Sequence, residues 1–158
     1  MRIVLLDAGT LGKDMDVSCF EKFGTFTAYR ATAAKDVPEH IKDADIVITN
    51  KVKLTSQVLA EAEHIKLICV TATGYDNVDM DYARKHGIGV CNVRDYSTES
   101  VAEVTLSLVL ALTYRLPVFD TYCKNGAYTA SGVQNLLEPV FYELSGKTWG
   151  VYGYGRIG

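Results

Sequence analysis

The stretch Leu67-Ile68-Cys69-Val70-Thr71-Ala72-Thr73-Gly74-Tyr75-Asp76-Asn77 contains a complete transition from a strand to a loop. Its first part, residues 67–71, is predominantly apolar, which is typical of a strand covered on both faces. A helical pattern follows at 79–86, with Asp79 as its candidate N-cap and Gly87 as its stop. A buried strand, a short loop and a helix in this order are the unit from which parallel α/β sheets are built.

The same alternation of strands and helices extends toward the N-terminus. A helical pattern covers 55–62, with Thr55 or Ser56 as its candidate cap. Further apolar runs of strand length lie at 2–7, 44–49 and 88–91, and a weaker one lies at 25–29. We therefore predict an α/β fold for residues 1–97, with a flavodoxin-like, doubly wound parallel sheet covered by helices on both faces.

The sequence changes character near residue 97, where we predict a domain boundary. The helical pattern at 99–116 is apolar nearly all round and is followed by Pro117, which we expect to end the helix. A helix without a polar face has to be buried on several sides. An irregular arm at 117–147 and a short strand at 148–152 follow.

The last six residues, Gly153-Tyr154-Gly155-Arg156-Ile157-Gly158, form a complete G-x-G-x-x-G pattern. After a strand, such a pattern opens a helix whose N-terminus binds a pyrophosphate, and its glycines permit a tight turn, close approach of the ligand and close packing. Neither that helix nor the acidic residue expected about 20 positions later follows in the sequence. We therefore expect the chain to be the N-terminal portion of a longer protein.

A ligand of an open parallel sheet binds outside the carboxyl ends of the strands, and the predicted order brings the loops 8–12, 50–53 and 72–77 together there. Gly74 lets the backbone approach a ligand, and consecutive free N–H groups after a strand form a nest for a carboxylate. An ordinary strand-to-helix turn is the alternative. Lys51 adds a positive charge to the nest, or it is a solvated lysine.

Composition and charge argue against several other functions. The 158 residues carry a net charge of −3 and no basic run, so we expect neither a nucleic-acid groove nor a membrane surface. The four cysteines lack C-x-x-C spacing and are interpreted as buried free thiols of a cytoplasmic protein, with zinc binding or a nucleophilic cysteine as the alternative. No cluster of metal ligands is present, and the three histidines are interpreted as surface residues, so no metal site is predicted.

Four motifs in this order resemble those of the NAD-dependent D-isomer-specific 2-hydroxyacid dehydrogenases, and most resemble the glycerate dehydrogenases, also called hydroxypyruvate reductases. Residues 49–55 look like the first substrate loop of that family, and residues 72–79 look like its substrate-carboxylate loop. Ser100-Val101-Ala102-Glu103 looks like the start of its interdomain helix. Residues 146–158 look like the entry to its cofactor domain.

The resemblance implies an oxidoreductase that transfers a hydride between NAD(H) and a small D-2-hydroxy acid or 2-keto acid of the glycerate, glyoxylate or lactate type. NADP in place of NAD stays open. Residues 1–97 would form the flavodoxin-like substrate domain. Residues 98–158 would form the interdomain helix, an arm and the start of a truncated Rossmann domain. The helix at 99–116 and the arm at 117–147 would form much of a homodimer interface.

The resemblance also assigns roles to individual residues. Lys51, Gly74 and Tyr75 would bind the substrate carboxylate. The cofactor would contact Thr73, Gly153, Gly155, Arg156, Ile157 and Gly158. The catalytic arginine, glutamate and histidine of the family have no counterpart in these residues, so we expect the chain to be inactive alone. A non-catalytic module that binds a carboxylate or mediates oligomerisation is the alternative.

Overall fold

The computed structural model describes all residues from Met1 to Gly158. The chain divides into two compact units, Met1–Arg94 and Asp95–Gly158. The first unit contains the sheet and the second contains three helices and a long segment without regular structure. Whether these units are the functional domains implied by the resemblance stays a prediction.

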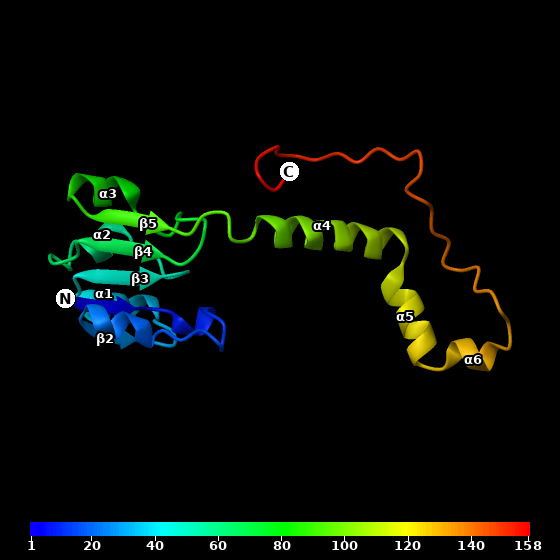
Figure 1. Cartoon of the computed structure of the whole chain (residues 1–158), viewed down its shortest axis with the longest axis horizontal. Coiled ribbons are helices and arrows are strands. Elements are labelled where there is room, and N and C mark those ends of the chain that lie inside the picture. The colour runs from blue at the N-terminus through cyan, green and yellow to red at the C-terminus, as the bar shows by residue number, and fades with distance from the viewer. The chain divides into compact units, whose positions relative to one another are not determined.

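Five parallel strands form the sheet of the first unit, in the order β2-β1-β3-β4-β5 (Figure 1). This order confirms the flavodoxin-like fold predicted from the sequence. The register aligns Leu5, Ile48, Cys69 and Cys91 in one row across the sheet. The strands are β1 (Arg2–Leu5), β2 (Thr25–Ala28), β3 (Ile46–Thr49), β4 (Leu67–Val70) and β5 (Gly89–Asn92). Because all are parallel, their carboxyl ends lie at one edge of the sheet.

Three short helices cover one face of the sheet: α1 (Val37–Ile41), α2 (Ser56–Leu59) and α3 (Met80–Lys85). Their buried side chains Val37, Ile41, Leu59 and Ala83 contribute to the core. The predicted caps are confirmed, because Thr55 accepts a hydrogen bond from the N–H of Val58 and Asp79 accepts one from Tyr82. Gly87 has a φ of 71°, as the predicted C-terminal stop requires.

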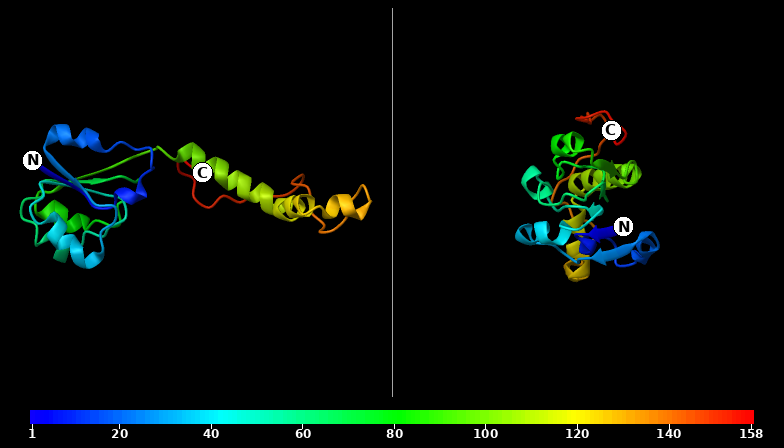
Figure 2. Two further views of the ribbon diagram at one scale, coloured as in Figure 1. Left: turned by 90° about the horizontal axis from the view of Figure 1, so that it is seen from below. Right: turned by 90° about the vertical axis from the view of Figure 1, so that its left-hand side faces the viewer.

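The other face carries only 3-10 turns, the longest being η2 (Ser18–Phe23), as the left panel of Figure 2 shows in blue. Two further 3-10 turns, η1 (Ala8–Thr10) and η3 (Ala34–Asp36), lie in the connections. Phe20 packs with the second core cluster around Ile3, Leu5 and Ile48. The sequence predicted helices on both faces of the sheet. On this face the structure has 3-10 turns in their place.

The second unit contains α4 (Thr98–Thr113), α5 (Leu116–Lys124) and α6 (Ala127–Ser131). The helix predicted at 99–116 ends earlier than expected, because Arg115 adopts a left-handed φ of 55°. Pro117 does not end a helix but lies in the first turn of α5, where its missing N–H costs nothing. The arm predicted as irregular at 117–147 is therefore partly helical.

Two further expectations for this unit differ from the structure. The apolar helix was expected to be buried on several sides, but α4 has no buried residue. The strand expected at 148–152 is absent, because a strand needs a neighbour for its backbone hydrogen bonds and no strand of this unit offers one. No single helix is long and apolar enough for a membrane span; α4 and α5 pass that test only as a pair bent by 68°.

Candidate functional site

The candidate site lies at the carboxyl edge of the sheet, where the loops after β1, β3 and β4 begin. The sequence predicted that the loops 8–12, 50–53 and 72–77 converge here. The loop after β1 is engaged elsewhere, because Ala8 and Gly9 donate to the carbonyls of Tyr29 and Arg30 at 2.9 and 2.8 Å. The residue that joins β1 to the neighbouring loop is Asp7.

Asp7 is buried, with 4% of its surface exposed, and its carboxylate accepts hydrogen bonds from the loop after β3. The N–H of Asn50 lies 2.9 and 3.0 Å from the two oxygens, and that of Lys51 lies 2.6 Å from Oδ2. Longer contacts come from the N–H of Val52 at 3.3 Å and the hydroxyl of Thr49 at 3.5 Å. These charge-assisted bonds compensate the burial of the carboxylate.

Asn77 ties the same loop to the loop after β4. Its Nδ2 donates to the carbonyls of Val52 at 3.0 Å and Asn50 at 3.5 Å. In return, the N–H of Leu54 donates to the carbonyl of Asn77 at 2.7 Å. A parallel bridge between Leu54 and Val78 extends this pairing. The two loops therefore form one hydrogen-bonded unit.

The sequence did not identify Asp7 or Asn77 as site residues. A signal was present for Asp7, since an acidic side chain that ends an apolar strand falls at the edge where ligands of such sheets bind. For Asn77 the signal was weaker, because an asparagine before a helix is also common in ordinary turns.

Residues 73–76 present unpaired backbone donors. The N–H groups of Gly74, Tyr75 and Asp76 have no hydrogen-bond acceptor within the chain, and all three residues are exposed. Thr73 is fixed beside them, since its hydroxyl donates to the carbonyl of Val93 at 3.0 Å and its carbonyl accepts from Asn92 Nδ2 at 2.7 Å. Consecutive unpaired N–H groups on an anchored loop have the donor pattern of an anion-binding nest.

Lys51 lies on the neighbouring loop with an exposed side chain that forms no ion pair, while its N–H is held by Asp7. Beside it, the Oδ1 of Asn50 is buried without a hydrogen-bond partner. An unpaired buried acceptor costs about 1–3 kcal/mol. This loop therefore has an exposed cation and a free acceptor, whereas its N–H donors are already used.

The glycine pattern at 153–158 lies in a segment without regular secondary structure, and no strand precedes it in this unit. Two of its glycines are required by the backbone: Gly153 has a φ of 102°, and a Cβ at Gly158 would collide with the carbonyl of Gly153. Arg156 pairs with Asp95 at 2.5 Å. The contacts expected between these residues and a dinucleotide cofactor stay a prediction.

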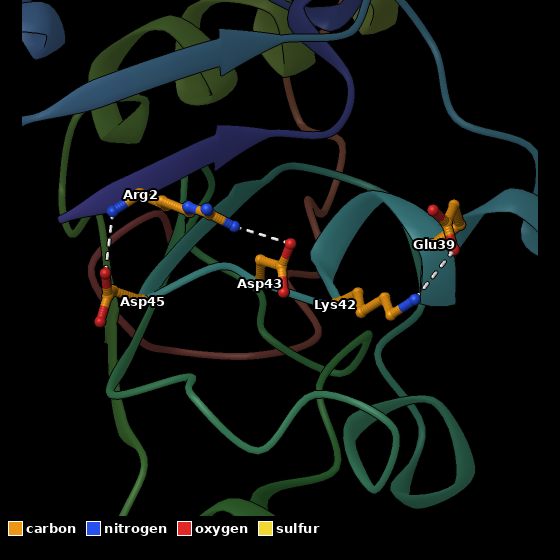
Figure 3. Close-up of polar contacts among 5 residues, drawn as sticks. All are labelled: Arg2, Glu39, Lys42, Asp43 and Asp45. Carbon is orange, nitrogen blue, oxygen red and sulfur yellow. Dashed lines mark hydrogen bonds and ion pairs between the residues drawn. The ribbon is translucent and has the colours of Figure 1, made fainter.

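A hollow of about 550 Å³ lies at the opposite, amino edge of the sheet, lined by Met1, Arg2, Thr25, Asp43, Asp45 and His64. The guanidinium of Arg2 pairs with Asp43 at 2.6 Å, and the backbone N–H of Arg2 donates to Asp45 at 2.8 Å. Figure 3 shows both contacts. That N–H, together with Lys66, lowers the pKa of Asp45. The charges of Arg2, Asp43, Asp45 and Lys66 thus pair with one another at an exposed surface, where such pairs contribute little.

Cysteines and histidines give no sign of a second site. The prediction that the cysteines are buried is wrong for Cys19, Cys91 and Cys123, which are exposed, and Cys69 is only partly buried. Burial, together with the neighbouring Cys91 thiol, raises the pKa of Cys69 to about 12, so Cys69 stays protonated at neutral pH. The prediction of a surface histidine fails for His40, which is partly buried, stacks on Tyr29 at 3.6 Å and lies 3.2 Å from the hydroxyl of Thr32. No group of three or more metal-ligating side chains is present.

The model of the family "D-isomer specific 2-hydroxyacid dehydrogenase, catalytic domain" matches residues 3–146. A hydroxypyruvate reductase of Blautia hydrogenotrophica is 34% identical over the whole chain and half of its own length. A glycerate dehydrogenase of Methylorubrum extorquens is 30% identical over 99% of the chain and half of its own length. The chain thus spans about half the length of the curated relatives it matches.

Solved structures give the same result. A D-lactate dehydrogenase of Aquifex aeolicus, crystallised with NAD and lactic acid, superimposes with a TM-score of 0.77 at 29% identity. The superposition covers the whole of this chain and 46% of that one. The similarity therefore extends over both units of the chain.

Proposed function

The chain belongs to the D-isomer-specific 2-hydroxyacid dehydrogenase family, and from this membership we propose that the protein reduces a small 2-keto acid to a D-2-hydroxy acid. The family was predicted from four ordered motifs, and the family model confirms it. The substrates we propose are of the hydroxypyruvate, glyoxylate or pyruvate type. The relatives named hydroxypyruvate reductase and glycerate dehydrogenase favour the first of these.

The observation that carries the proposal is the run of unpaired N–H groups at residues 74–76. A 2-keto acid presents a carboxylate, which accepts several hydrogen bonds at once. Amides of Gly74 and Tyr75 would bind that carboxylate, and the exposed Lys51 would add a positive charge nearby. Binding the carboxylate in this way orients the adjacent keto carbon, which is the atom that is reduced.

We propose a nicotinamide cofactor, NAD, with NADP not excluded; when bound, it supplies the hydride. In this proposal Thr73 lies at the nicotinamide end of the site, and the residues assigned to the pyrophosphate are Gly153, Gly155, Arg156, Ile157 and Gly158. Hydride transfer also requires a proton for the forming alkoxide. None of the three histidines lies on the loops of the candidate site, so this chain provides no identified donor.

We further propose that the protein is a cytoplasmic homodimer. Five large apolar side chains of α4 are exposed, namely Val101, Val104, Leu106, Leu108 and Leu112. Exposed apolar patches of this kind usually mark an interaction surface. The arm after α4 also exposes large apolar residues, including Leu137 and Tyr142. The four free cysteines fit a reducing compartment.

A titration with hydroxypyruvate, followed by amide NMR of the chain, tests the substrate site. We expect the N–H signals of Gly74, Tyr75 and Asp76 to shift at millimolar ligand, because these donors are free. Hydroxyacetone, which has the ketone and the hydroxyl but no carboxylate, serves as the matched control and should leave the signals unchanged. Equal shifts with both ligands, or shifts confined to other residues, would refute a carboxylate nest at this loop.

A further inference from the structure

We propose that Asp7 is a positioning residue of the substrate site, holding the loop of Lys51 in register with the free amides of residues 74–76. This inference rests on the proposed function, because it concerns the same site. Asp7 is unsuited to proton transfer with a substrate, since it is buried and both of its oxygens already accept hydrogen bonds. Its influence on a ligand therefore has to pass through the loop.

The charge of Asp7 is compensated by backbone N–H groups and not by a cationic side chain. No lysine, arginine or histidine forms an ion pair with this carboxylate. Its compensation comes from the N–H groups of Asn50, Lys51 and Val52, which follow one another in the chain. A buried charge is tolerated only with such partners, so the carboxylate and the loop conformation depend on each other.

Only one of the two neighbouring loop segments, 50–52 and 74–76, keeps free N–H donors for a ligand. Parallel strands end in two adjacent loops here, and both present consecutive backbone N–H groups. Asp7 occupies the donors of the loop at 50–52, whereas the donors of residues 74–76 are free. The acidic side chain thereby confines carboxylate binding to the second loop. It leaves Lys51 able to act through its side chain alone.

Hydrogen bonds connect these two loops. Asp7 holds the segment at 50–52 through its N–H groups, while Asn77 holds the same segment through the carbonyls of Asn50 and Val52. Asn77 directly follows the residues with free amides. Hydrogen bonds therefore join Asp7 through residues 50–52 to Asn77, the residue that follows the free amides, and they fix the backbone of Lys51 relative to that residue.

Asp7→Asn tests the proposal, because asparagine keeps the size of the side chain but turns an NH₂ group toward the loop amides. Asp45→Asn is the matched control: Asp45 also accepts a backbone N–H, from Arg2 at 2.8 Å, but at the amino edge of the sheet (Figure 3). We expect Asp7→Asn to weaken hydroxypyruvate binding at least tenfold and to speed amide exchange at residues 50–52. Asp45→Asn should change neither quantity.

A purely structural role is separated from positioning by kinetics and by a second variant. In the holoenzyme, Asp7→Asn should raise KM for the 2-keto acid at least tenfold and change kcat less than twofold. If Asp7→Asn does not fold, Asn77→Ala takes its place, because it removes the hydrogen bonds to the carbonyls of the same segment. KM, kcat and amide exchange at residues 50–52 of that variant then test the proposal. Faster exchange at 50–52 with unchanged binding would overturn the proposal. Failure of the unsubstituted protein to bind hydroxypyruvate would instead refute the proposed function, while amide exchange would still report whether Asp7 holds the loop.

Discussion

The two units of the chain differ in how their structure is stabilised. Every buried residue lies in the unit Met1–Arg94, where two apolar clusters cover the two faces of the sheet. The unit Asp95–Gly158 has no buried residue, although its longest helix is the most apolar segment of the chain. A protein stabilises a fold by removing apolar surface from water, so the first unit has its own source of stability and the second does not.

Helix caps show the same difference. The helices α2 and α3 begin with side chains that accept a backbone N–H, Thr55 and Asp79. None of the helices α4, α5 and α6 has a side-chain cap. In the first unit, α1 is the only α-helix that lacks such a cap. The second unit thus lacks the burial of the first, and its helices lack side-chain caps at their N-cap residues. We infer that its apolar surface serves association, which agrees with the homodimer proposed above.

The largest expected effect comes from removing apolar volume in each unit. Ile68 is fully buried in β4, an interior strand of the sheet, so Ile68→Ala should lower the free energy of unfolding by about 2–5 kcal/mol. Leu112 on α4 is 72% exposed, and Leu112→Ala should stay within about 0.5 kcal/mol in dilute solution. Urea unfolding followed by circular dichroism measures both. A comparable loss for Leu112→Ala at high dilution would contradict the contrast between the units.

The accuracy of the predictions made from the sequence also differs between the two units. In the first unit, capping residues and apolar runs are local signals that agree with the final packing, so the strands, Thr55 and Asp79 were predicted correctly. In the second unit, the strand at 148–152 was predicted from local pattern alone and has no neighbour to pair with. The left-handed conformation of Arg115, which ends the helical path early, has no signal in its residue type.

The candidate site was only half predictable for a related reason. The loop around Gly74 carries its signal within a few residues, a glycine after an apolar strand. Asp7 depends on a contact with residues 43–45 positions away, so its role emerges only from the sheet order and register. The sequence predicted a role only for the side chain of Lys51. The structure shows in addition that the backbone N–H of Lys51 donates to Asp7.

A smaller effect is expected from a charge on the exposed stripe of α4. Val104, Leu108 and Leu112 are spaced four residues apart and share one face of the helix. Leu108→Glu should weaken self-association at least tenfold, which corresponds to about 1.4 kcal/mol, because an unpaired charge would be desolvated at the interface. Sedimentation over a range of concentrations measures this. Ser107→Glu adds the same charge away from the stripe and should have little effect; equal weakening by both variants would argue against a defined interface.

The smallest effect concerns the caps of the first unit and has a definite pH dependence. The N–H of Tyr82 donates to Asp79 at 2.9 Å and holds the pKa of that carboxyl below its ordinary value. A carboxyl with a lowered folded-state pKa stabilises the protein above its unfolded-state pKa, which is about 4 for aspartate. That contribution is lost as the pH falls through the lower, folded-state value.

Asp79→Asn should therefore lower the urea midpoint at pH 7, and the difference from the unsubstituted protein should shrink steadily below about pH 4. Thr55→Ala is the matched control at the other capped helix, because a hydroxyl does not titrate. It should cost roughly 0.5–1 kcal/mol, at the lower end for a cap since its hydrogen bond is long at 3.4 Å. This loss should be the same at both ends of the pH range. A pH-independent difference for Asp79→Asn would mean that the cap stabilises α3 through its geometry and not through its charge.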